Sequence, residues 1–138
     1  MKASTHPHFG QRTLAAALLL FSITTAPAHH SGAMFDRSKT VTLNCTVKAF
    51  RFVAPHSWIA VLANIEGRDE PVRWDVETGP AGRMKALGLT PDNLKPGDKV
   101  IIRVHPLRDG RNAGIMIDIK LADGTVVQNN ASLVPIGK

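Results

Sequence analysis

The chain has 138 residues, one cysteine and a formal net charge of +6 at pH 7, from 17 Lys and Arg against 11 Asp and Glu. The single cysteine excludes an internal disulfide, and the length suits one domain that buries a core without such links. The basic excess is mild and contains no block of Lys and Arg, so it does not predict nucleic-acid binding.

The first 28 residues have the three parts of a secretory signal. Residues 1–12 are basic and contain no acid, residues 14–23 form an apolar run, and residues 24–28 end in the small-residue pattern Ala-x-Ala. The apolar run is shorter than the roughly 20 residues that a helix needs to span a bilayer. We therefore expect Sec-type export with cleavage after Ala28, and a periplasmic or secreted protein with no membrane span after cleavage. An uncleaved N-terminal anchor is the alternative.

Cleavage removes two basic residues and no acid, which lowers the number of Lys and Arg from 17 to 15 and the net charge from +6 to +4.

After the cleavage site, strand patterns alternate with turns. Alternating or continuous apolar residues predict strands at 40–53, 57–64, 71–77, 100–105, 113–121 and 125–127. Residues 81–87 predict one short helix, which Gly88 ends.

Three strands, a helix and two or three further strands are the element order of an OB-like barrel. The fold prediction is a mainly all-β, five- to six-stranded OB-like barrel, with an open β-sandwich as the alternative. The predicted domain boundaries are a signal peptide at 1–28, an N-terminal arm at 29–39, the β domain at 40–128 and a C-terminal tail at 129–138.

The alternation also predicts which side chains face the core. In the first strand the expected inward residues are Val41, Leu43, Cys45, Val47 and Ala49, with a bend or bulge near the aromatic pair Phe50 and Phe52. Cys45 is thus expected to be a small buried hydrophobe, and pairing between chains is the alternative. In the fifth strand one face should carry Ile115, Ile117, Ile119 and Leu121, and the other Met116, Asp118 and Lys120.

Several short motifs follow one another along the mature chain in a specific order. They are His29-His30-Ser31 with Phe35-Asp36, Val41-Thr42-Leu43 with Thr46-Val47-Lys48, Pro55-His56-Ser57-Trp58-Ile59, Trp74 with Glu77, Leu94-Lys95-Pro96-Gly97-Asp98-Lys99-Val100, His105-Pro106-Leu107-Arg108-Asp109-Gly110, and Leu121-Ala122-Asp123-Gly124. Through these motifs the chain resembles a family of small secreted bacterial proteins known only as a domain of unknown function. The resemblance implies a small exported β domain and supplies no activity. Cys45 departs from the family pattern, in which glycine is expected.

Four histidines remain after cleavage, and they are the candidate metal ligands: His29, His30, His56 and His105. A terminal His29 offers its α-amine and its imidazole together, and nitrogen donors of this kind suit Cu(II). His30 can add a third nitrogen, and His56 or His105 can complete the set if the arm folds back over the barrel. A solvated arm with adventitious copper affinity is the alternative. No CxxC or HExxH pattern is present.

Two tryptophans and two arginines are the candidates for a ligand groove. Trp58 and Trp74 lie on neighbouring predicted strands, where core packing is the default for large aromatic residues. Arg103 and Arg108, together with Arg111 nearby in the sequence, are the candidates for an anion-facing rim, and a solvated surface without a partner is the alternative. The partner class is an envelope protein or an anionic ligand, and the sequence leaves the oligomeric state open.

No pattern in the sequence predicts an enzyme. Cys45 lies within a strand, without the electropositive setting that a nucleophile needs. Asp75 and Glu77 share a strand face with Arg73, which predicts a row of solvated ion pairs rather than acid–base chemistry. We therefore predict a non-enzymatic exported protein that binds copper or another divalent metal through His29. The alternative is an OB-like module that binds a protein or an anionic envelope ligand.

Overall fold

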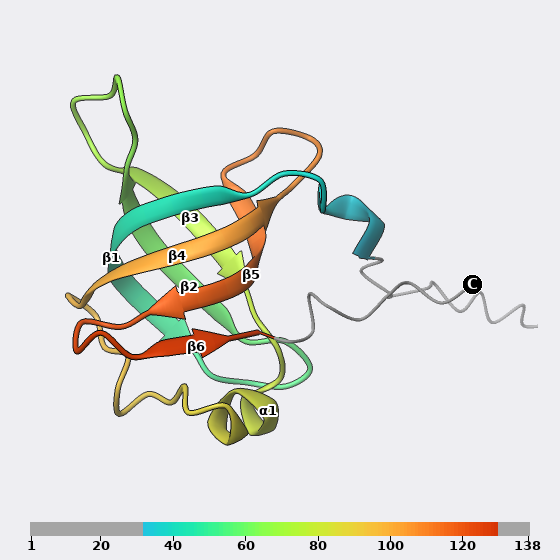
Figure 1. Ribbon diagram of the computed structural model, residues 1–138, viewed down its shortest axis with the longest axis vertical. Helices are drawn as coiled ribbons and strands as arrows, with labels where there is room; N and C mark the ends of the chain where they lie inside the picture. The colour runs from blue at the N-terminus through green and yellow to red at the C-terminus, as the bar shows by residue number, and fades with distance from the viewer. Residues whose placement is uncertain (1–31, 130–138) are drawn as a thin grey trace, which may run out of the picture.

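The computed structural model describes residues 32–129. The predicted signal, His29, His30 and all but the first residue of the predicted tail lie outside the described residues. The elements, in chain order, are the 3-10 turn η1 (Gly32–Met34), β1 (Val41–Arg51), β2 (Trp58–Asn64), β3 (Val72–Glu77), α1 (Ala81–Ala86), β4 (Lys99–Pro106), β5 (Ala113–Lys120) and β6 (Val126–Gln128) (Figure 1). Each predicted strand and the predicted helix are present, with ends displaced by at most two residues.

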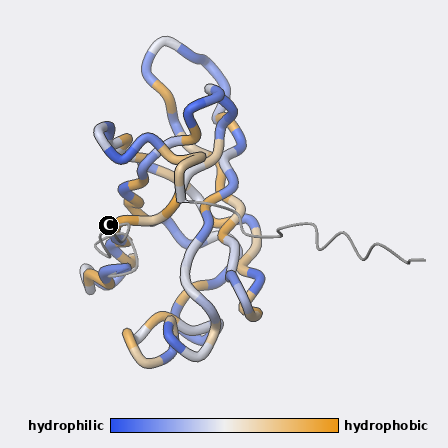
Figure 2. The backbone as a smooth tube through the Cα atoms, turned by 90° about the vertical axis from the view of Figure 1, so that its right-hand side faces the viewer, coloured by the Kyte–Doolittle hydropathy of each residue, from blue (hydrophilic) through white to orange (hydrophobic). Residues whose placement is uncertain are grey.

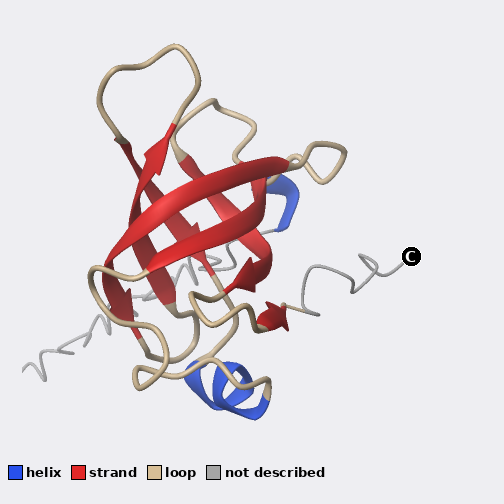
Figure 3. Cartoon of the chain, turned by 60° about the vertical axis from the view of Figure 1, so that its left-hand side comes forward, coloured by secondary structure: helices blue, strands red, loops and turns tan. Residues whose placement is uncertain are grey.

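The sheet closes on itself. Its strand order is β3-β2-β1-β4-β5-β6, and β3 also pairs with β5 in parallel. Because β5 is bonded to both β4 and β3, the first five strands form a closed OB-like barrel, and β6 extends it beside β5 (Figure 3). The predicted OB-like barrel is confirmed, and the alternative of an open β-sandwich is wrong.

A bulge in β1 changes which side chains face the core. Val47 pairs with Val61 and Ala49 with Ala60, so Lys48 has no direct partner on β2. The four inward residues before the bulge were predicted correctly, but Ala49 is exposed and Phe50 packs against the core instead. The predicted irregularity near the aromatic pair is therefore confirmed, and it lies slightly earlier in the strand.

A second bulge corrects the predicted faces of β5. Val104 pairs with Met116 and Arg103 with Asp118, which leaves Ile117 without a direct partner on β4. Met116 is consequently fully buried rather than on the outer face, whereas Ile117 is only half-buried. The predicted period of two fails here because one extra residue in a strand exchanges its faces.

The core fills the barrel and continues under α1. Met84 is the only buried residue of the helix, and with Leu89 and Leu94 it joins the cluster of barrel side chains. Figure 3 places the helix below one end of the barrel, whereas the β2–β3 connection projects from the barrel and is largely hydrophilic (Figure 2). Cys45 is buried, as expected, and burial raises the pKa of its thiol to about 11, so the reactive thiolate is disfavoured.

Candidate functional site

The connection between β1 and β2 is held by a buried serine. The Ser57 hydroxyl donates to the Val53 carbonyl at 3.0 Å and accepts from the Val53 N–H at 3.2 Å. The Ser57 backbone is bonded to Gly79 and Thr78, at the end of β3. These bonds close the loop over residues 53–57 and fix the backbone position of His56, the residue before Ser57.

His56 is paired with a buried carboxylate. Its Nδ1 lies 2.9 Å from Oε1 of Glu77, whose side chain is only 5% exposed, whereas the ring of His56 is 44% exposed. The Nδ1–H donates to the carboxylate, which leaves Nε2 as the imidazole nitrogen available to solvent or a ligand. The sequence predicted Glu77 in a row of solvated ion pairs, and this part of the prediction is wrong, because the loop brings His56 onto Glu77. The other part is correct, since Arg73 pairs with Asp75 at 3.0 Å.

Trp58 is the first residue of β2 and lies on the outer face of the barrel formed by β1, β2 and β3, at the end where β1 and β3 finish. It is half-buried, and its Cα partners are Arg51 on β1 and Glu77 on β3. Its side chain lines three hollows, of about 280, 320 and 260 Å³. Trp58 thus borders all three depressions, on the face that OB-folds use for ligands.

Small residues and charged residues both line these hollows. The small residues are Ala49, Ala54, Ala60, Ala113 and Gly114. The charged and ionisable residues are Arg51, His56, Arg73, Asp75, Glu77 and Arg111. Arg111 pairs with Asp109 at 2.7 Å in the β4–β5 connection, and its backbone and side-chain hydrogen bonds lower the pKa of Asp109 below 3.8. We name the face formed by these residues and Trp58 the Trp58 face.

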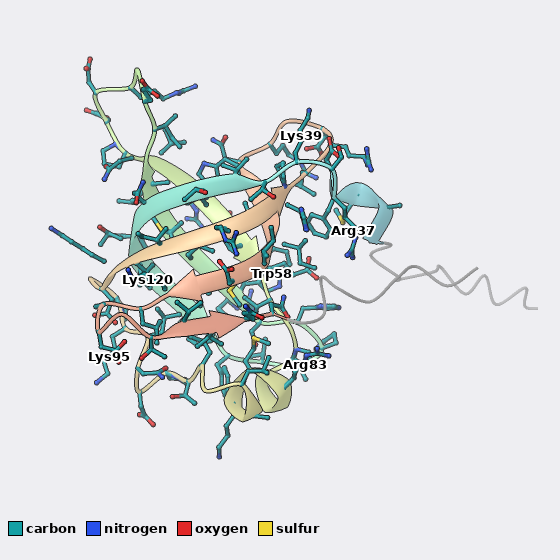
Figure 4. All side chains as sticks on the ribbon, in the orientation of Figure 1. Arg37, Lys39, Trp58, Arg83, Lys95 and Lys120 are labelled. Carbon is teal, nitrogen blue, oxygen red and sulfur yellow. The ribbon has the colours of Figure 1, made fainter. Side chains whose placement is uncertain are left out.

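The N-terminal arm borders the Trp58 face. Phe35 forms an isolated β-bridge with Leu107, and both residues line the 280 Å³ hollow together with Met34 and Trp58. Arg108, a predicted rim residue, instead donates from Nε to the Ala33 carbonyl at 3.0 Å and so holds the arm. Figure 4 shows Trp58 on the side of the barrel that carries Arg37 and Lys39 of the arm, away from Lys95 and Lys120.

Asp36 fixes the arm by both its backbone and its carboxylate. Its N–H donates to the Pro106 carbonyl at 2.8 Å, and its carboxylate accepts from the Ser38 hydroxyl at 2.6 Å. The Ser38 hydrogen bond, together with Arg108 and Lys39 nearby, holds the pKa of this carboxyl below its usual 3.8. A group whose pKa is lowered on folding stabilises the folded state above its unfolded pKa, and this contribution is lost as the pH falls through the folded pKa.

We expect Asp36→Asn to increase amide hydrogen exchange in residues 33–39 severalfold at neutral pH. In the unsubstituted protein, the same increase should occur only when the pH falls below about 4, after correction for intrinsic exchange. Asp123→Asn is the matched control, because the pKa of Asp123 is also lowered, by hydrogen bonds from Thr125 in the β5–β6 turn. An arm that exchanges equally in all three proteins would contradict this role for Asp36.

The structure separates the other predicted site residues from the Trp58 face. Trp74 faces inward and is 8% exposed. The prediction that Trp74 lines a groove is therefore wrong, and the default expectation that it packs in the core is correct. Arg103 forms an ion pair with Asp118 on the outer surface of β4 and β5. Arg103 therefore lies away from the three hollows, and its role in anion binding stays a prediction. Of the four groove candidates only Trp58 lines the face, together with Arg111 from the predicted rim.

The two described histidines have separate partners. Nδ1 of His105 donates to the Lys39 carbonyl at 2.8 Å, whereas His56 pairs with Glu77. Between residues 32 and 129, no group of three or more His, Cys, Asp or Glu side chains is placed to hold a metal ion. The same part of the chain contains no helix that is long and apolar enough to cross a membrane.

These observations define a small OB-like barrel protein with an aromatic-centred depression on its β1–β2–β3 face. The chain belongs to the family of unknown function DUF6152, whose profile matches residues 17–117. This membership confirms the resemblance to a domain of unknown function. Neither a curated protein nor a solved structure gives a significant match to the chain.

Proposed function

We propose that the chain is an exported, non-catalytic binding module that holds its ligand on the Trp58 face. The observation that carries the proposal is the position of Trp58, one half-buried aromatic side chain that borders three adjoining hollows. OB-folds bind their ligands on this face and between the β1–β2 and β4–β5 connections. Here those connections supply His56 and Arg111 to the hollows.

The side chains around Trp58 favour binding over catalysis. No Ser, Thr, Cys, Lys or Tyr is among the described residues that line the three hollows, so the nucleophile types in the lining are limited to its carboxylates and His56. Asp75 is engaged by Arg73 and Glu77 by His56. Export is part of the proposal because of the signal pattern in residues 1–28.

Trp58→Ala is expected to weaken ligand binding by about 2 kcal/mol or roughly 30-fold, as for a central aromatic anchor. The probes are tetragalacturonate, cellotetraose and a short oligothymidylate, each titrated into isotope-labelled exported protein and followed by NMR. At least one probe should shift the Trp58 indole resonance and the amides of β2 and β3, and the variant should lose these shifts. Leu62→Ala is the control, because Leu62 faces outward on the same strand but lines none of the three hollows. Shifts confined to another face, or no shifts with any probe, would contradict the proposal.

Copper binding by the mature N-terminus is a second candidate function, which the attachment of the arm favours. The 3-10 turn at Gly32–Met34 is held at the rim of the Trp58 face, and Met34 lines a hollow with Glu77, the partner of His56. Only three peptide units separate Gly32 from His29, so covalent geometry limits their Cα distance to about 11 Å. The carboxylate on Nδ1 of His56 also leaves Nε2 available, which is the usual arrangement of a histidine metal ligand.

A Cu(II) titration tests this second candidate. Protein that starts at His29 should bind one Cu(II), and one extra residue before His29 should weaken binding about tenfold or more, because it removes the α-amine from the chelate. His56→Ala should weaken binding less, since it removes one supporting nitrogen. Equal and weak binding by both N-termini would exclude a terminal-histidine site and leave the proposal for the Trp58 face unaffected.

A further inference from the structure

Arg51 is the one arginine of the Trp58 face that has no ionic partner among residues 32–129. It lies at the end of β1, directly opposite Trp58 on β2, and its side chain is exposed. The bulge at Lys48 is the reason for this position, because it turns Arg51 to the outer face together with Ala49. The other two arginines of the face, Arg73 and Arg111, are paired with carboxylates.

The hollow next to Arg51 is positively charged. It has a volume of about 260 Å³, and its lining includes Arg51, His56 and Trp58 but no acidic side chain. The carboxylate that pairs with its histidine, that of Glu77, is buried. A planar guanidinium without a counter-ion, beside an imidazole, is suited to a carboxylate that it binds with two parallel hydrogen bonds.

On the rest of the Trp58 face the charged side chains nearly cancel one another. Asp75 and Glu77 line the hollows together with Arg73 and Arg111. An arginine and a carboxylate that pair with each other keep further N–H donors and oxygen acceptors, and these can form hydrogen bonds with hydroxyl groups. The carboxylate beside each paired arginine also repels a second anion. The face therefore combines one anion subsite with several subsites for hydroxyl groups.

Trp58 and the small residues beside it complete this pattern. The indole is large, rigid and partly apolar, and the alanines at positions 49 and 60 leave space for a ring to approach the barrel wall. A sugar ring has an apolar face and a hydroxylated rim, so it matches both the indole and the paired charges. OB-folds are known to accept oligosaccharides on this face.

Other ligand classes fit the face less well. Single-stranded nucleic acids stack successive bases on several aromatic side chains along a cationic groove. Here two aromatic side chains, those of Trp58 and Phe35, line the described hollows, and Phe35 is buried and so offers no surface for a base to stack on. Carboxylates also stand beside two of the three arginines. A peptide that adds as a strand requires an open edge, but β2 is paired on both sides, with β1 and β3.

We infer that the Trp58 face binds an acidic saccharide, whose ring lies against Trp58 and whose carboxylate pairs with Arg51. This inference rests on the proposed function of the same face and names its ligand class. Uronic acids and lactyl-substituted amino sugars both have the required chemistry, a carboxylate attached to a hydroxylated ring.

The test compares each acid with its own methyl ester. The probes are tetragalacturonate and the disaccharide of N-acetylglucosamine and N-acetylmuramic acid, titrated calorimetrically into the exported protein. Esterification removes the charge and keeps the ring. At least one acid should bind roughly tenfold or more tightly than its ester, which is the effect of one charge-assisted pair. Arg51→Gln should reduce this preference to near unity, because it removes the charge that distinguishes the acid from its ester.

Two matched variants separate this effect from a general loss of positive charge or of the face itself. Lys120→Gln removes one exposed cation from a different hollow, of about 310 Å³, and should leave both affinities unchanged. Trp58→Ala should weaken the acid and the ester alike. A preference for the acid that survives Arg51→Gln would overturn the assignment of Arg51.

The possible failures of the inference and of the proposed function are distinguishable. If acids and esters bind equally and both shift the Trp58 resonance, the acidic specificity is wrong and the binding face remains. If neither acid shifts that resonance but the oligothymidylate does, the inference is overturned in favour of nucleic acid and the binding face again remains. If no probe shifts the resonance, both proposals fail.

Discussion

Gly114→Ala is expected to lower the free energy of unfolding by about 3 kcal/mol, because an added methyl group there meets backbone rather than open space. A Cβ at Gly114 lies 2.6 Å from the carbonyl oxygen of His105 and 3.0 Å from the Val104 side chain. Gly114 pairs with Pro106 on β4 and with Val76 on β3, so it lies at the seam where the barrel closes. Relief of the clash requires β4 and β5 to separate at this seam.

Urea unfolding followed by far-UV circular dichroism measures this effect. Gly82→Ala is the matched control, since a Cβ at this exposed position of α1 has no atom within 4 Å, and it should stabilise the protein by up to about 1 kcal/mol. Because Gly114 also lines the hollow beside Trp58, the variant should lose probe binding together with stability. Equal unfolding midpoints for the two alanine variants would contradict the close packing at the seam.

Met84→Ala is expected to cost about 2–5 kcal/mol, the usual range for truncating a fully buried side chain. Met84 has no exposed surface and is the only buried residue of α1. Its terminal methyl group packs 2.9 Å from the point where a Cβ on Gly79 would lie, so Gly79 has no side chain with which to fill the space that truncation leaves. The helix would lose its one anchor to the core.

Lys85→Ala, on the exposed side of the same short helix, is the control for Met84→Ala. This change should alter the free energy of unfolding by less than about 0.5 kcal/mol, because surface substitutions away from special features have little effect. Since α1 lies at one end of the barrel and lines none of the three hollows around Trp58, Met84→Ala protein that remains folded should retain probe binding. Similar stabilities of the two variants would show that α1 is not needed to close the core.

The Trp58 face depends on two features that a sequence pattern does not contain. The bulge at Lys48 places Arg51 opposite Trp58, although an unbroken alternation from Val47 would have turned Arg51 inward. The loop closed by Ser57 brings His56 onto Glu77, which lies 21 positions later in the chain. In each case the neighbouring strand or loop decides where the side chain lies.

The sequence by itself determined the number and order of the strands, the single helix and the membership in the OB-like class. It also determined that Cys45 and Trp74 are buried, because apolar alternation is a local property that persists in the folded sheet. Only the tertiary structure decided the faces of β5, the partner of Glu77 and the grouping of Arg51, His56 and Trp58. Register and bulges arise from pairing between strands that are far apart in the chain, and one extra residue in a strand exchanges its two faces. The local sequence pattern therefore does not distinguish a side chain of the Trp58 face from one in the core. Only the pairing of strands in the closed barrel separates them.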